Sequence, residues 1–266
     1  MARHVAPWLI AASVAFTGVA GAETPQEKGL RLARAADAHD AGFGNFTVRS
    51  VMTLRDGTGT ESVRDFRQDV LEVHGDGDKS LIVFHSPPDV KGTALLTHAH
   101  VSGDDDQWLL LPALNRVKRI SASNRSGSFV GSEFAYEDIS SQEVEEFSYA
   151  WLRDEACPAP DPTLTCHVID RFPIYEGSGY IRQQVWMDSK EFRVLRIDYF
   201  DRKESHLKTL RAENYERYLD RHWRPARMVM INHQTGKETD LDWSDYKFDA
   251  GLDDGDFTKR ALERAH

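Results

Sequence analysis

Apolar positions near the start of the chain follow a helical spacing first and an alternating spacing afterwards. Thr24-Pro25-Gln26-Glu27 combines an N-cap residue, a proline at the first helical position and a glutamate three residues after the cap. This pattern predicts a helix from about Pro25 to His39, which Gly42 and Gly44 end. From Asn45 onwards every second residue is apolar, which predicts a strand with one buried face.

The alternating pattern recurs along the rest of the chain in runs that turn-forming residues separate. Seven or more such runs indicate a sheet of antiparallel strands. A short final helix is predicted from its cap at Asp256 through Leu262. Further strands are predicted at Leu81–Phe84, Ala94–Val101, Trp108–Leu111, Val117–Ile120, Phe147–Leu152, Ile181–Met187, Phe192–Phe200, Trp223–Ile231 and Thr239–Phe248.

Many of these strands carry polar residues on one face only, as Arg182 and Gln184 do. A sheet with one polar face must bury the other, and the sequence offers only two or three short helices to cover it. We therefore expect a mainly β fold of the α+β class. The expected form is an incomplete antiparallel β-barrel or strongly curved sheet with an N-terminal helix and short plug helices. No composition break marks a linker, so residues 23–266 are predicted to form a single domain.

Residues 1–22 have the pattern of a secretory signal peptide. Arg3 precedes an apolar stretch from Trp8 to Ala20, and Ala20-Gly21-Ala22 fits a cleavage site. The apolar stretch is short for a membrane span, so cleavage is expected, with an uncleaved anchor as the alternative. No cysteine follows the cleavage site that could carry a lipid, and the mature protein is expected to be soluble.

The charge balance excludes some functions. The chain has 33 Lys and Arg residues against 43 Asp and Glu residues, a formal net charge of −10. So acidic a chain repels phosphate backbones, and the sequence has no compensating basic stripe interleaved with aromatic residues. We therefore expect no nucleic acid partner and no adhesion to anionic lipid surfaces through bulk charge.

Cys157 and Cys166 are the two cysteines of the chain. In an oxidising compartment two cysteines so close in sequence form a disulfide most simply. Closing so short a loop would stabilise the fold by about 2 to 3 kcal/mol in the chain-entropy model. The spacing differs from the C-x-x-C of redox sites, and two buried free thiols are the alternative.

The residues Thr97-His98-Ala99-His100 could present two imidazoles to one metal, because alternate residues of a strand point the same way. Their outline resembles the T-H-x-H-x-D-H signature of metallo-β-lactamase-like hydrolases. Ser102 and Gly103 stand where that signature needs aspartate and histidine, so a surface or cavity histidine pair is the favoured interpretation. No nucleophile elbow, Walker loop or dinucleotide-binding glycine pattern occurs, and we predict no metal, no cofactor and no catalysis.

Two longer stretches resemble a known family. Residues Trp108–Ile120 fit the pattern W-x-x-L-P-x-x-x-R-x-x-R-I, and Ser128–Asp138 fit S-F-x-G-S-x-F-x-Y-x-D. Together they are similar to the LolA-like periplasmic proteins, in the branch of outer-membrane lipoprotein-sorting proteins. The opening helix, the W-x-P-x-R-M stretch from Trp223 and the turn at Asp256-Phe257-Thr258 extend the resemblance over the mature chain.

The resemblance implies a periplasmic carrier or chaperone that holds the acyl chains of a lipid or lipoprotein and moves them towards the outer membrane. It further implies an RND-type inner-membrane transporter as a possible partner, with only transient membrane contact. The alternatives are a binding subunit of an envelope transporter that carries no cargo, and a zinc-dependent envelope hydrolase using His98 and His100.

The strand pattern supplies candidate residues for an apolar cavity, although each could equally be packed core, since alternation marks a buried face and not what fills it. Arg116, Arg119 and Tyr136 are candidates for a head-group or lid contact, because guanidinium groups bind phosphate or carboxylate in pairs of hydrogen bonds. A salt bridge from either arginine to Glu133, Glu137 or Asp138 is the alternative. The cavity candidates are Val48, Met52, Leu96, Trp108, Leu110, Phe129, Phe134, Val185, Met187, Leu195 and Ile197.

Overall fold

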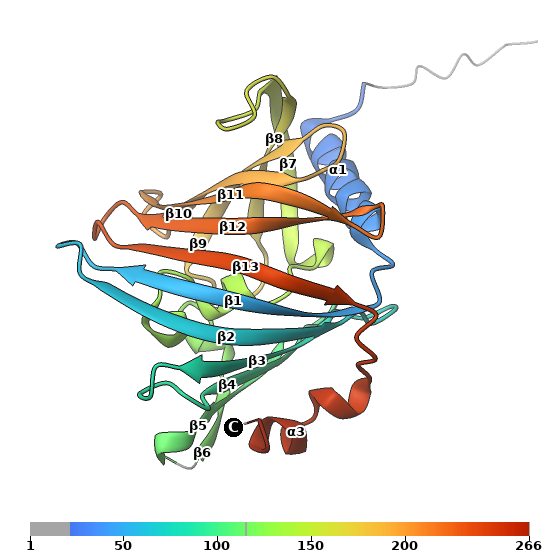
Figure 1. Ribbon diagram of the computed structural model, residues 1–266. Coiled ribbons are helices and arrows are strands. Elements are labelled where there is room, and N and C mark those ends of the chain that lie inside the picture. Colours follow the sequence, from blue (N-terminus) through green and yellow to red (C-terminus); the bar gives the residue numbers. More distant parts are fainter. Residues whose placement is uncertain (1–21, 115, 266) are drawn as a thin grey trace, which may run out of the picture.

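A computed structural model describes residues 22–114 and 116–265. The predicted signal peptide therefore lies outside the described residues, apart from Ala22. The described strands form a single antiparallel sheet of 13 strands that curves around a concave side (Figure 1). Among the described residues, no helix combines the length and the apolar character that a membrane crossing needs.

The bounds of the elements are as follows. The strands are β1 (Asn45–Arg55), β2 (Glu61–Leu71), β3 (Lys79–Ser86), β4 (Ala94–His98), β5 (Asp106–Leu111), β6 (Arg116–Ile120), β7 (Phe147–Ala156), β8 (Thr165–Pro173), β9 (Tyr180–Asp188), β10 (Val194–Asp201), β11 (His206–Tyr218), β12 (His222–Asn232) and β13 (Glu238–Phe248). The helices are α1 (Pro25–Asp40), α2 (Tyr136–Ile139) and α3 (Lys259–Glu263), with 3₁₀ turns η1 (Pro112–Leu114), η2 (Ala122–Asn124), η3 (Phe129–Gly131), η4 (Val144–Glu146) and η5 (Asp254–Phe257).

The sheet consists of two runs of sequential hairpins that meet at one pairing. Strands β1 to β6 form one run and β7 to β13 the other, and β1 pairs with β13 between them. The outermost strands, β6 and β7, stand at opposite ends of the strand order, so the sheet does not close on itself. The predicted fold class, an incomplete antiparallel barrel with few helices, is confirmed.

Three strands escaped the sequence analysis, namely β2, β8 and β11. Other predictions need correction at their ends. The strand predicted from Phe192 begins at Val194, and the strand predicted to end at Leu152 runs to Ala156. The strand predicted to reach Val101 stops at His98, where the chain turns and the Ala99 amide donates to the Asp78 carbonyl. The final helix is capped by Thr258, whose side chain accepts from the Ala261 amide, whereas Asp256 lies in the preceding 3₁₀ turn.

Helix α1 covers the edge of the sheet at β7. Its predicted capping box is present, with the Thr24 and Glu27 side chains each accepting from the other's backbone amide. Gly29 brings the helix close to the strand: a Cβ atom there would lie 2.9 Å from the Trp151 amide nitrogen. The edge strand is therefore shielded from pairing with another chain.

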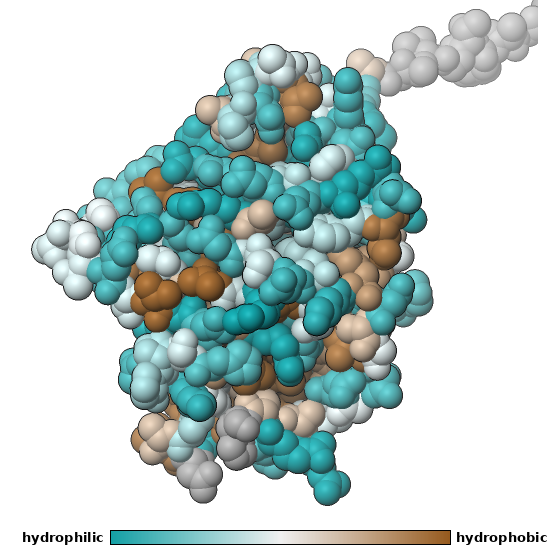
Figure 2. Space-filling model, in the orientation of Figure 1, coloured by the Kyte–Doolittle hydropathy of each residue, from teal (hydrophilic) through white to brown (hydrophobic). Residues whose placement is uncertain are grey.

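The two faces of the sheet bury different sets of residues. On the concave face lies the central cluster, in which Phe66, Phe84, Met230 and Leu241 pack beneath the plug. On the convex face a smaller cluster packs under α3 and the η5 turn through Phe257 and Leu262. Figure 2 shows the side that faces the viewer in Figure 1 covered largely by hydrophilic residues.

The segment from residue 122 to 146 is the plug, made of η2, η3, α2 and η4. It lies behind the strands in Figure 1 (green) and inserts Phe129 against Phe84, with ring centroids 5.8 Å apart. The Arg64 guanidinium donates to the Val130 carbonyl, and Lys208 pairs with Asp138 at 2.7 Å. The plug is thus fixed by buried aromatic packing and by two cationic side chains of the sheet.

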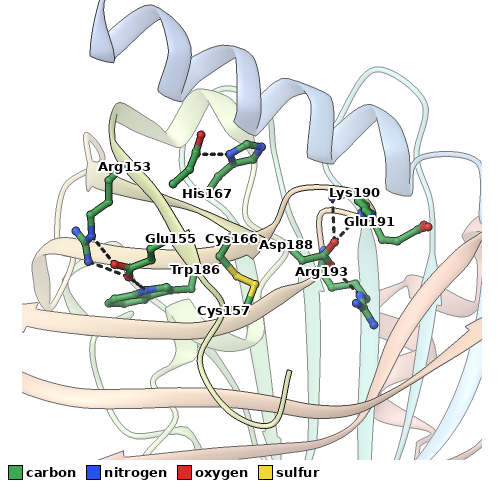
Figure 3. Close-up of a disulfide and its surroundings, with 11 residues drawn as sticks. Arg153, Glu155, Cys157, Cys166, His167, Trp186, Asp188, Lys190, Glu191 and Arg193 are labelled. Carbon is green, nitrogen blue, oxygen red and sulfur yellow. Dashed lines mark hydrogen bonds and ion pairs between the residues drawn. A yellow bond between two sulfur atoms is a disulfide. The ribbon is translucent and has the colours of Figure 1, made fainter. Parts of the chain in front are cut away.

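The β7–β8 hairpin is closed by the predicted disulfide between Cys157 and Cys166 (Figure 3). Both cysteines are buried against Trp186 of β9 and Leu195 of β10. Glu155 accepts from the Trp186 indole at 2.7 Å and pairs with Arg153, beside the disulfide. The disulfide therefore joins the two ends of a proline-containing loop, Pro158–Leu164, and packs on the neighbouring strands.

Candidate functional site

Two adjoining hollows lie between α1 and the concave side of the sheet, and together they are called the α1 cavity below. Their volumes are about 420 and 680 Å³, within the range of sites that hold small molecules. They share Ala36 and Asp40 of α1, Phe43 beyond its end, and Val194 of β10. The apolar and aromatic lining residues are Ala33, Ala36, Ala41, Phe43, Phe46, Val70, Val73, Val101, Ile139, Val144, Tyr149, Ile169, Val185, Met187, Phe192, Val194, Tyr215, Trp223 and Pro225.

Small side chains on α1 leave this space open. Ala33 and Ala36 lie three residues apart, so they share the face of the helix that points towards the sheet. On the opposite wall, Val185 and Met187 alternate along β9 and therefore point to the same side. The cavity thus exists because α1 presents alanines where bulkier residues would fill the gap.

The rim of the cavity is acidic. Asp37, Glu72, Asp78, Glu143 and Glu145 all line the larger hollow. Burial raises the pKa of Asp78 to about 7, and burial raises the pKa of Asp37 and of Glu143 as well. Neighbouring carboxylates add to each of these shifts. The negative charge of the Asp78 carboxyl is therefore reduced near neutral pH, which lowers the cost of placing apolar matter beside it.

The cationic side chain of Arg224 ties α1 to the opposite wall of the smaller hollow. Arg224 of β12 pairs with Asp40 at 2.5 Å and lies over the rings of Phe43 and Phe46. Trp223 donates its indole N–H to Glu191 at 2.9 Å. The Arg224–Asp40 pair fixes the C-terminal end of α1 over the cavity, while the Trp223–Glu191 bond joins β12 to the turn between β9 and β10.

All eleven residues predicted as cavity lining are buried, but they do not come together. Val185 and Met187 line the α1 cavity. Leu96, Trp108 and Leu110 instead pack on the convex face against α3. The alternation of apolar residues predicted correctly that these positions are buried. It could not tell the concave face from the convex face, because both faces of β4 and β5 are buried. Of the others, Met52, Phe129, Phe134 and Ile197 belong to the central cluster, Val48 packs with Phe46 and Val70, and Leu195 packs beside the disulfide.

The head-group candidates are also separated. Arg116 and Arg119 are exposed on the edge strand β6, where Arg119 pairs with Asp106 of β5. Tyr136 is buried in the plug against Phe129, with centroids 5.8 Å apart. The alternative salt bridges from these arginines to the plug acids are absent from the described part of the chain. Glu137 accepts from Tyr175, Ser178 and the Gly179 amide, Asp138 pairs with Lys208, and Glu133 accepts from Asn232.

His98 and His100 are engaged with different partners. The His98 ring lies 2.6 Å from the Phe257 carbonyl through Nε2, and burial lowers its pKa. His100 lies 2.9 Å from Asp76 through Nδ1, and this contact raises the pKa of the histidine. Within the described ranges, no three His, Cys, Asp or Glu side chains are placed to hold a metal ion.

Ala33, Ala36 and Phe43, which line the cavity, were not predicted as site residues from the sequence. The available signal was the mild apolar pattern of the first helix, whose apolar positions are mostly small. A helix of that kind covers a surface without filling it. Lys208 was also missed, because it lies on a strand rich in charged residues.

Comparisons with known proteins agree with this architecture. A family profile described only as uncharacterized-protein-like matches residues 76–264. An outer membrane lipoprotein-sorting protein domain, so named in its crystal structure, from Vibrio parahaemolyticus is 47% identical, with a TM-score of 0.86 over 90% of this chain and 100% of that chain. A DUF1329 family protein from Desulfovibrio piger is 31% identical, with a TM-score of 0.83 over 90% of this chain and 99% of that chain.

A LolA superfamily protein from Nitrosomonas europaea shares the fold at 22% identity, with a TM-score of 0.68 over 88% of this chain and 98% of that chain. No curated protein matches the chain.

Proposed function

The chain belongs to the family of outer membrane lipoprotein-sorting proteins with the LolA-like fold, and on this premise we propose that it is a carrier which binds acyl chains in the α1 cavity. The cargo is a lipid or the lipid part of a lipoprotein. The observation that carries the proposal is the cavity between α1 and the concave face of the sheet, whose walls combine apolar side chains with an acidic rim.

The energetics of transport call for such an enclosure. Each CH₂ group of an acyl chain in water costs about 0.8 kcal/mol relative to an apolar surrounding, so a chain of a dozen carbons costs roughly 10 kcal/mol. A wall of aliphatic and aromatic side chains offsets this cost while the cargo crosses an aqueous space. Val185, Met187 and Val194 on the sheet and Ala33 and Ala36 on α1 provide that wall.

The acidic rim selects among acyl compounds. Carboxylates at Glu72 and Glu145 would repel an anionic group placed at the cavity. Uncharged acyl compounds, such as esters and diacylglyceryl groups, meet no such repulsion. The cavity therefore favours acyl chains whose nearest polar group carries no negative charge.

We further propose that the protein works in the periplasm and delivers its cargo towards the outer membrane, with an RND-type transporter of the inner membrane as a partner. The name of its relative from Vibrio parahaemolyticus supports the direction of delivery. The Cys157–Cys166 disulfide supports an oxidising compartment. The predicted signal peptide is consistent with export.

Filling the cavity tests the acyl-binding proposal. Ala36 lines both hollows, so Ala36→Trp is expected to weaken binding of an uncharged fluorescent monoacylglycerol by tenfold or more, roughly the loss of two buried CH₂ groups. Ala38→Trp on the exposed side of the same helix is the matched control and should leave the affinity within about twofold. Fluorescence titration measures both.

Two outcomes would contradict the proposal. One is a wild-type protein that gives no saturable signal with the probe. The other is equal affinity in Ala36→Trp and the wild type, with thermal unfolding showing that the variant is folded.

A further inference from the structure

A hollow separate from the α1 cavity, of about 700 Å³, lies at the opposite end of the sheet. It is formed by the plug, the β10–β11 turn and the β12–β13 turn, which stand at the left of Figure 1, whereas α1 stands at the right. Arg224 at the α1 cavity and Asn232 at this hollow are eight positions apart on β12, which is roughly 25 Å along a strand. The two sites are therefore distinct.

This basic hollow is lined by four cationic side chains, those of Arg202, Lys203, Lys208 and Lys237, against the carboxylates of Glu133 and Asp201. The whole chain carries a net charge of −10, so the local excess of positive charge runs against that of the protein. Within the described part of the chain, three of the four cations, Arg202, Lys203 and Lys237, have no carboxylate within 4 Å. The fourth cation, Lys208, forms an ion pair with Asp138.

The hollow is held in place by buried contacts. Lys208 is 4% exposed, donates to Asp138 at 2.7 Å and to the Glu133 carbonyl at 2.9 Å, and lies over the Tyr180 ring. Arg202 donates to the Ser178 carbonyl from both Nε and Nη2, at 3.1 and 2.7 Å. One edge of this guanidinium is thus anchored, and its Nη1 group has no acceptor among the described residues.

The two carboxylates of the hollow, Glu133 and Asp201, accept hydrogen bonds from neutral amide groups. Glu133 accepts from the Asn232 amide at 2.7 Å. Asp201 accepts from Gln234 and from the Lys203 and Ser205 backbone amides, and these bonds lower its pKa. With Lys208 paired to Asp138, the three cations Arg202, Lys203 and Lys237 outnumber the carboxylates Glu133 and Asp201, so the site keeps a net positive charge for an external anion.

We propose that the basic hollow binds a phosphate ester, the head group of a glycerophospholipid. An anchored guanidinium offers paired N–H donors to phosphate oxygens, and the lysines add mobile positive charge. The floor of buried Phe134, Ala135 and Tyr180 suits the glycerol and first methylene groups. The inference rests on the proposed function only for naming a lipid as the source of the phosphate.

The charges at the two ends of the molecule are complementary. Carboxylates at the α1 cavity repel an anion, whereas the basic hollow attracts one. A phosphate group near the protein is therefore directed to the end of the sheet away from α1.

Calorimetric titration of the full chain with sn-glycerol 3-phosphate tests the site. The double variant Arg202→Gln with Lys237→Gln is expected to weaken binding by roughly tenfold or more, because contacts from charged donors are lost. The control, Lys118→Gln with Lys247→Gln, removes the same charge from exposed positions outside the hollow and should change the affinity by less than about twofold. Equal weakening in both pairs would show bulk charge alone and overturn the site, as would the absence of saturable binding.

Two lipids identify the source of the phosphate. A lysophosphatidic acid should compete with glycerol 3-phosphate and bind more tightly than it, and should lose affinity in Arg202→Gln with Lys237→Gln. If it binds no more tightly, the lipid assignment is wrong and the site takes soluble phosphate esters. A monoacylglycerol of the same chain length should bind equally to wild type and both variants. Its failure to bind wild type would contradict the α1 cavity and leave the anion site standing.

Discussion

Asp78 links the stability of the fold to pH through its place at the cavity rim. Among the described residues its carboxyl accepts a single long hydrogen bond, 3.3 Å, from the Val73 amide, and burial raises its pKa from an ordinary value of 3.8 to about 7. As pH rises from about 4 to 7, the unfolded chain releases this proton while the folded protein retains it. The contribution of Asp78 to the free energy of unfolding is therefore greatest below pH 4. It is lost as the pH rises through 7.

Asp78→Asn removes the cost of ionising a buried carboxyl group, because the side-chain amide is never charged. We expect the variant to equal the wild type near pH 4 and to exceed its free energy of unfolding at pH 8 by about 1 to 2 kcal/mol, a figure reduced for the partial exposure of the side chain. Urea unfolding at the two pH values measures this difference. Asp89→Asn, at an exposed position, should show no such pH-dependent gain. A variant less stable than wild type at pH 8 would contradict the assignment.

Helix α1 is the element on which the cavity depends, and its position is set by Gly29. Glycine lowers helix stability by about 1 kcal/mol relative to alanine, so Gly29→Ala would ordinarily stabilise the helix. Here the added Cβ would lie 2.9 Å from the Trp151 amide nitrogen and 3.0 Å from that of Ala150, which are backbone atoms of β7. The helix must therefore move away from the strand.

We expect Gly29→Ala to lower the free energy of unfolding by about 1 to 3 kcal/mol, because overpacking outweighs the gain in helix propensity. Denaturant unfolding measures the change. Ala38→Gly on the exposed side of α1 reports the propensity effect alone, about 1 kcal/mol. A more stable Gly29→Ala protein would show that α1 is not held against β7 as described.

Among the strands, the sequence predicts those in which apolar and polar residues alternate regularly and misses those in which they do not. The alternation from Phe46 to Leu54 identified β1 because one face is apolar throughout. Strands β2 and β11 were not predicted because charged residues such as Arg64, Asp65 and Glu213 interrupt their alternation. Arg64 contacts the plug and Asp65 pairs with Arg49 of β1, whereas Glu213 pairs with Arg211 of its own strand. The partners of Arg64 and Asp65 lie on other elements, so no local sequence pattern predicts these two contacts.

For the whole molecule, the sequence predicted an incomplete barrel with a helix and a plug, which is the observed form. The position of the cavity was not predictable in the same way. It depends on how α1 crosses the sheet, and on alanines whose small size matters only because of what they face. The strand pattern could identify Val185 and Met187 as buried but could not show that a cavity adjoins them and not Leu96 or Leu110.

The central claim is that acyl chains bind between α1 and the concave face. The most direct measurement is methyl NMR of the protein with a monoacylglycerol that carries a nitroxide on its chain. The account predicts strong broadening of the Val185 and Met187 methyl signals, while those of Leu96 and Leu110, on the opposite face, stay sharp. Uniform broadening, or broadening confined to Leu96 and Leu110, would contradict it.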